Sequence, residues 1–125
     1  MTYLDTHIVV WLRQGEDGPF SKRARQAMDA DDELLISPMV MLELQTMHEI
    51  GRLKPSVDQV LEEVGGEVGL RVCSFPFGLV MDQALKEKWT CDPFDRIIVA
   101  HAAARRATLI TRDQKILRHY PRAVW

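Results

Sequence analysis

The sequence predicts an α/β fold in which helices cover both faces of a parallel sheet. Short apolar segments alternate along the chain with longer segments that repeat apolar residues at helical spacing, which is typical of βαβ units. The short segments are apolar without clean alternation, as expected for strands that are buried on both sides. The 125 residues are enough to bury such a core, so we expect a single domain over residues 1–125.

The individual elements follow from the apolar runs and from the residues at their ends. Apolar residues on both sides of Asp5 predict one short buried strand at the start of the chain. Ser21 suits a helix N-cap, Pro38 suits a first helical turn, and Gly65-Gly66 suits a helix end. The expected strands lie at 3–4 with 8–10, 34–36, 70–72, 108–111 and 123–125. The expected helices cover 21–30, 39–50, 56–64, 77–88 and 93–106, and a polar loop covers 14–19.

Composition argues against several classes of protein. No apolar run approaches the ~20 residues that span a bilayer, and a carboxylate as early as Asp5 is unlike a signal peptide. Cys73 and Cys91 lack metal-binding spacing, which suits reduced thiols in a cytoplasmic protein. The net charge is −2, although residues 96–125 carry seven Lys/Arg against one acid. This basic C-terminal segment is suited to binding phosphate groups. The excess of Lys and Arg by itself is explained more simply by solvent-exposed positions on helices and turns.

Four carboxylates from separated segments are expected to converge. Asp5 and Asp113 each follow a predicted strand, and parallel sheets bind ligands at the carboxyl ends of their strands. Glu43 shares a helix face with apolar residues, where a Glu is rare unless it is paired or bound to a metal. Asp95 lies in the first turn of the helix over 93–106, on the face expected to pack on the sheet. Each acid taken alone is also explained as a cap, a turn residue or an edge position.

Four carboxylates in one place need a counter-charge. No Lys or His pattern in the sequence neutralises them, so a cation must do so. All-oxygen ligands suit Mg²⁺ or Mn²⁺, whereas zinc prefers cysteine and histidine. Asp92 suits the N-cap of the helix over 93–106, and whether it is also a ligand stays open. The histidines show no ligand spacing and are expected at the surface or in the core: His7, His48, His101 and His119.

These segments resemble the PIN domain in their order and spacing. The matching residues are Tyr3-Leu4-Asp5-Thr6-His7, Glu43, Asp92-Pro93-Phe94-Asp95-Arg96 and Thr111-Arg112-Asp113. More narrowly, the chain resembles the VapC-type toxins of toxin–antitoxin pairs over residues 3–125. The resemblance implies a three-layer α/β/α sandwich with a central short-stranded parallel sheet. It also implies a metal-dependent endoribonuclease that forms a homodimer and is inhibited by a cognate antitoxin.

The resemblance further implies roles for individual residues. The acids Asp5, Glu43, Asp95 and Asp113 would hold one or two Mg²⁺ or Mn²⁺ ions that activate water to hydrolyse RNA. Two polar residues would support them: Thr6 and Thr111. RNA would approach over basic residues: Arg96, Arg112, Lys115 and Arg118. The apolar residues in the segment 39–64 are more than one helix face needs, so they belong either to the core or to a surface for a partner: Met39, Met41, Met47, Val57, Val60 and Leu61. We expect an amphipathic segment of the antitoxin to pack there and an Arg or Lys from it to reach the acids.

A second hypothesis stays open at this stage. The protein would then be a non-catalytic PIN-fold module that binds a partner or RNA, and its acids would serve only as structural caps. Phosphoryl-transfer folds that use an early Asp as phosphoacceptor fit less well, because Asp5-Thr6-His7 contains neither an Asp-x-Asp motif nor a second acid.

Overall fold

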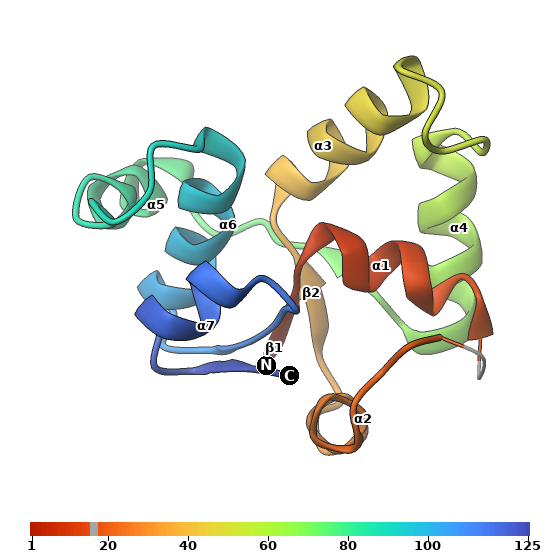
Figure 1. The fold of residues 1–125 in the computed structure, drawn as a ribbon, viewed down its shortest axis with the longest axis horizontal. Coiled ribbons are helices and arrows are strands. Elements are labelled where there is room, and N and C mark those ends of the chain that lie inside the picture. Colours follow the sequence, from red (N-terminus) through yellow and green to blue (C-terminus); the bar gives the residue numbers. More distant parts are fainter. Residues whose placement is uncertain (16–17) are drawn as a thin grey trace.

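The protein is built around a five-stranded sheet in which all neighbouring strands are parallel (Figure 1). The computed structural model describes residues 1–15 and 18–125. The strand order is β3-β2-β1-β4-β5. The strands are β1 (Thr2–Leu4), β2 (Leu34–Ile36), β3 (Arg71–Val72), β4 (Thr108–Ile110) and β5 (Ala123–Val124). The predicted sandwich of helices around a short-stranded parallel sheet is therefore confirmed.

Helices flank the sheet on both sides. They are α1 (Thr6–Leu12), α2 (Lys22–Asp29), α3 (Pro38–Glu49), α4 (Val57–Val68), α5 (Phe77–Ala84), α6 (Pro93–Ala104) and α7 (Gln114–His119). In Figure 1, α5, α6 and α7 lie to one side of β1 and β2, α1 and α4 lie to the other, and α2 lies at the bottom. None of the helices in the described part of the chain is long and apolar enough to cross a membrane.

The central strand explains why the sheet is covered on both faces. Every residue of β1 is buried, and Tyr3 lies opposite Leu35 on β2 and Leu109 on β4. A three-residue strand with no exposed side must pack against helices above and below it. Because the strands are parallel, the residues that follow them meet at one edge of the sheet, and this edge carries Asp5 and Thr111.

The prediction of a strand that continues through residues 8–10 is wrong, because these residues lie in α1. The chain leaves β1 at Leu4, and the side chain of Asp5 accepts a hydrogen bond from the backbone N–H of Thr6 as the N-cap. Ile8 and Val9 are fully buried on the inner face of α1. Burial and capping thus outweigh the β-propensity of this run. Of the loop expected over 14–19, residues 16–17 lie outside the described part of the chain.

The prediction that Gly65-Gly66 ends a helix is also wrong. Helix α4 continues through both glycines to Val68 and ends at Gly69, which has φ +71°. The turn at Gly69 suits a helix C-cap, because glycine adopts the left-handed conformation without steric cost. The first turn of α4 carries a capping box between Ser56 and Gln59, so the helix is fixed at both ends.

The two glycines Gly66 and Gly69 therefore predict opposite effects of the same substitution. Gly66→Ala is expected to raise the free energy of unfolding by about 0.5–1 kcal/mol, because Gly66 is helical and an added Cβ meets open space. Gly69→Ala is expected to lower it by about 1 kcal/mol, because φ is positive there. Urea denaturation of the two variants checks this, and equal effects would contradict the position of the helix end.

Candidate active site

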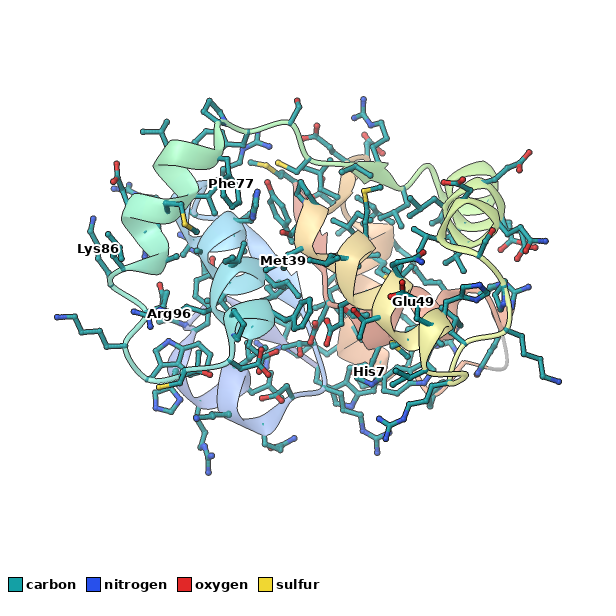
Figure 2. All side chains as sticks on the ribbon, turned by 90° about the horizontal axis from the view of Figure 1, so that it is seen from above. His7, Met39, Glu49, Phe77, Lys86 and Arg96 are labelled. Atoms are coloured by element: carbon teal, nitrogen blue, oxygen red, sulfur yellow. The ribbon has the colours of Figure 1, made fainter. Side chains whose placement is uncertain are left out.

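A pocket of about 360 Å³ lies at the carboxyl edge of the sheet and gathers the four predicted acids. Its lining residues come from five elements or the turns beside them: Asp5, His7, Trp11, Glu43, Asp95, Arg112 and Asp113. Figure 2, seen from above, shows side-chain oxygens gathered between α6 and α3, with His7 beside them. Residues that lie up to 108 positions apart in the chain thus line one hollow, as the parallel sheet requires.

Asp5 is held in a fixed orientation at the bottom of this site. It is only 7% exposed, and its two oxygens accept separate hydrogen bonds. Oδ1 accepts from the Thr6 backbone N–H at 2.8 Å, and Oδ2 accepts from the Thr111 hydroxyl at 2.6 Å. Burial raises the pKa of Asp5, and these two hydrogen bonds oppose the rise. The site therefore holds a desolvated carboxyl group whose position is fixed by the start of α1 and by the residue that follows β4.

Glu43 reaches the pocket from α3. The fully buried side chains of this helix are Val40 and Leu44. The half-buried Glu43 accepts a hydrogen bond from the Thr6 hydroxyl, and burial raises the pKa of its carboxyl group. Thr6 thus connects two of the acids, through its backbone to Asp5 and through its hydroxyl to Glu43.

Asp95 carries the clearest electrostatic signature of the site. It lies in the first turn of α6, two residues after Pro93, as the sequence predicts. The pKa of Asp95 is raised to about 7, first by burial and then by the negative charges of the neighbouring acids: Asp92, Asp5, Asp113 and Glu43. A helix N-terminus would by itself favour an ionised acid. The rise therefore reflects desolvation and crowding with like charges.

Two further acids cap helices beside the pocket. Oδ1 of Asp113 accepts from the backbone N–H groups of Lys115 and Ile116 at 2.8 and 2.9 Å, and so caps α7. Oδ1 of Asp92 accepts from Phe94 at 2.8 Å and caps α6. Asp113 lines the pocket, whereas Asp92 is exposed and is not among the lining residues. Asp92 therefore acts on the site through its charge on Asp95.

The acids are not yet arranged as a complete set of metal ligands. Among residues 1–15 and 18–125, no three carboxylate, imidazole or thiol side chains are placed to hold one ion as they stand. They nevertheless share one pocket, and their charges act on one another. The all-oxygen donor set fits a hard divalent cation once rotation of the side chains brings the oxygens together.

The basic residues predicted to meet RNA separate into two groups. Arg112 lines the pocket, and Lys115 and Arg118 are exposed on α7. Arg96 is different, because its Nε donates a hydrogen bond to the carbonyl oxygen of Ala84 at 2.8 Å. This bond ties α6 to the C-terminal end of α5, so Arg96 contributes to helix packing. Its Nη groups are not used by this bond, and a phosphate contact for Arg96 stays a prediction.

His7 and Trp11 line the pocket, although neither was predicted to have a role at the site. They lie four positions apart on α1 and their rings are 6.0 Å apart, so both project from one face of that helix. The charge of His7 lowers the pKa of Asp5 and of Glu43, against the larger effect of burial. The signal that would have found them is this helical spacing, which the expected strand over residues 8–10 concealed.

The apolar surface predicted for a partner does not consist of the expected residues. Val57 and Val60 belong to the buried core, where they are 8% and 0% exposed. The methionines of α3 and Leu61 are partly buried and pack against the same core. The exposed large apolar side chains here are Leu42 of α3 and Ile50, which directly follows the helix. The core therefore uses most of the apolar residues between 39 and 64.

Comparison with known proteins agrees with this architecture. The family model described as "PIN domain" matches residues 2–122. The protein "Ribonuclease VapC22" of Mycobacterium tuberculosis is 30% identical over 127 residues, which cover 97% of this chain and 94% of that protein.

Solved structures share the fold at lower sequence identity. A toxin–antitoxin complex from Klebsiella pneumoniae contains a chain with a TM-score of 0.67 and 20% identity, covering 100% of this chain and 97% of that chain. VapBC2 from Rickettsia felis, bound to a DNA fragment from its promoter, has a TM-score of 0.61 and 20% identity, covering 94% of this chain and 92% of that chain. VapBC-1 from nontypeable Haemophilus influenzae has a TM-score of 0.62 and 19% identity, covering 100% of this chain and 96% of that chain. The sequence match over almost the whole chain, together with this fold, shows that the chain belongs to the PIN-domain family as a VapC-type protein.

Proposed function

We propose that this protein is a divalent-metal-dependent endoribonuclease that acts as the toxin of a type II toxin–antitoxin pair. The observation that carries the proposal is the pocket in which Asp5, Glu43, Asp95 and Asp113 meet from four separate segments. The relative from M. tuberculosis, which is named a ribonuclease, supports the assignment of RNA as substrate. The domain that carries this activity spans residues 1–125.

The four acids hold Mg²⁺ or Mn²⁺, as one ion or two. A bound ion of this kind lowers the pKa of a bound water and stabilises the charge that develops on the phosphate. Thr111 and Thr6 keep the Asp5 carboxylate in place, and Thr6 also orients Glu43. Because its pKa is raised to about 7, Asp95 is ionised in only part of the molecules at neutral pH as long as no cation balances the neighbouring acids. A cation in the pocket favours the ionised form of Asp95, so binding of the ion releases protons.

The remaining parts of the proposal concern substrate and partners. RNA approaches over Arg112, which lines the pocket, and over Lys115 and Arg118, which are exposed on the helix that begins directly after the pocket residue Asp113. A cognate antitoxin inhibits the enzyme, in keeping with the toxin–antitoxin complexes that share the fold. The toxin forms a homodimer. Two free cysteines, Cys73 and Cys91, suit the reducing cytoplasm in which its RNA substrates occur.

Removal of the metal tests the catalytic part of the proposal. The purified protein is expected to cleave total bacterial RNA in Mg²⁺ or Mn²⁺, and cleavage is expected to stop in EDTA and return when Mg²⁺ is added in excess. Gel electrophoresis of the RNA gives the readout. Cleavage that continues at full rate in EDTA would reject the metal-dependent site.

A specific observation favours a second candidate function. Asp92 and Asp113 both cap helices, so part of the acidic cluster has a structural explanation. The chain would then be a non-catalytic module of the same fold. In that case the wild-type protein would leave RNA intact in every divalent metal, while it still bound RNA or a partner protein.

A further inference from the structure

Arg112 has an unusual setting for an arginine beside several acids. It follows β4 by two residues, lines the pocket with Asp5 and Asp95, and is exposed. Its guanidinium carbon lies 5.8 Å from the centre of the Trp11 ring and 5.7 Å from the centre of the Trp125 ring. The two rings are themselves 5.7 Å apart and tilted by 58°. Arg112 is therefore flanked by aromatic rings from α1 and from the end of β5.

The acids of the pocket do not neutralise this arginine. The ion pairs found among the described residues join Arg13 to Glu63, Arg71 to Glu33, and the N-terminus to Asp31. No hydrogen bond from the side chain of Arg112 to another described residue is present either, so its N–H donors are available to an anion. The two rings border the guanidinium and limit where it can lie.

Electrostatics shows which ligand needs this arrangement. A phosphodiester that approaches four carboxylates is repelled, and among the residues that line the pocket Arg112 is the one arginine or lysine. The planar fork of N–H groups in arginine matches two oxygens of one phosphate. A free arginine in this position would instead turn toward Asp5 or Asp113 and cancel their charge. Contacts that keep the guanidinium of Arg112 away from these acids therefore leave it free to bind a phosphate.

We infer that Trp11 and Trp125 are positioning residues that hold Arg112 ready to bind a backbone phosphate of RNA beside the acidic pocket. This inference rests on the proposed ribonuclease function and adds to it the part of the substrate that Arg112 recognises. The tryptophans act through the arginine, since both rings contact the same guanidinium. The contribution of the two tryptophans to RNA binding should therefore disappear when Arg112 is replaced.

A double-mutant cycle tests the inference directly. The probe is a fluorescently labelled single-stranded RNA of mixed sequence, about 12 nucleotides long, bound in EDTA so that it stays intact. Arg112→Ala is expected to weaken binding about 10-fold and to reduce the slope of log K against log[salt] by about 0.7. Trp125→Leu is expected to weaken binding about 3-fold in the wild-type background and to have no further effect in the Arg112→Ala background.

Matched variants separate positioning from simple stability. Trp125→Phe keeps an aromatic face and is expected to retain nearly wild-type binding. Trp89→Leu removes a tryptophan that stacks on His119 instead and is expected to leave binding unchanged. Arg122→Ala removes the same charge from a residue directly before β5, at the opposite edge of the sheet from the acids, and is expected to leave binding almost unchanged.

Two results would overturn the inference while the proposed function stands. One is a Trp125→Leu effect that persists in the Arg112→Ala background, which would assign the rings to direct stacking on bases. The other is a Trp125→Phe variant as weak as Trp125→Leu. If the wild-type protein neither binds this RNA nor cleaves total RNA in Mg²⁺, the proposed function itself fails.

Discussion

Asp95→Asn is expected to lower Mg²⁺-dependent RNA cleavage at least about 100-fold, and Asp5→Asn is expected to do the same. Each substitution keeps the shape of the side chain and removes one negative charge from the metal-binding pocket. Asp5 reaches this pocket from the turn after β1 and Asp95 from α6, so neither can replace the other. Initial rates of RNA cleavage at limiting Mg²⁺ give the comparison.

Asp58→Asn is the matched control for this experiment. Asp58 is also an acid in the first turn of a helix, in α4, but it is exposed and is not among the residues that line the pocket. Its substitution should leave the rate of cleavage unchanged. Full activity of both pocket variants would remove Asp5 and Asp95 from the proposed metal site.

Asp95→Asn is also expected to make the metal-free protein more stable, although most substitutions destabilise. The pKa of Asp95 is raised from 3.8 to about 7, so its ionised form is unfavourable in the folded protein. The whole shift corresponds to an upper bound of ~4 kcal/mol at pH above 7. Because the pocket opens to solvent, we expect a gain of ~1–2 kcal/mol. Thermal unfolding in EDTA measures it.

The pH dependence of this stability has a definite sign. Between pH 3.8 and about 7 the folded protein retains a proton on Asp95 that the unfolded chain has lost. Wild-type stability therefore falls as pH rises through this window, and the contribution of Asp95 to that fall is absent in Asp95→Asn. The variant should gain most over the wild type above pH 7 and little near pH 4.

Excess Mg²⁺ should remove or reverse this advantage, because the wild-type protein gains binding free energy that the variant loses. Asp58→Asn should show no such dependence on Mg²⁺. If Asp95 only interacts with the helix N-terminus, Asp95→Asn should instead unfold at a slightly lower temperature than the wild type in both buffers.

Much of the fold could be predicted because its signals are local. The apolar run at 34–36 and the Ser37-Pro38 pair after it define a buried strand and the start of a helix within five residues. The segment 8–10 could not be assigned in this way, because its β-branched residues favour a strand locally. Its helical state depends on the Asp5 cap and on burial against elements far away in the sequence.

In the site, too, the features set by local sequence could be predicted, whereas those set by contacts between distant residues could not. The acids could be placed together because each one follows a strand or begins a helix at the same edge of the sheet. The role of Arg112 could not be distinguished from that of Arg96, since both adjoin a predicted ligand in the sequence. The difference lies in long-range contacts: Arg96 bonds to Ala84, and Arg112 contacts Trp125.

Direct binding of Mn²⁺ tests the central claim that the four acids form a metal site. Titration of the protein with Mn²⁺ at neutral pH, followed by the electron paramagnetic resonance signal of the free ion, gives affinity and stoichiometry. We predict that the wild-type and Asp58→Asn proteins bind one or two ions with equal affinity, and that Asp5→Asn and Asp95→Asn bind at least about 10-fold more weakly. Equal binding by all four proteins would contradict the claim.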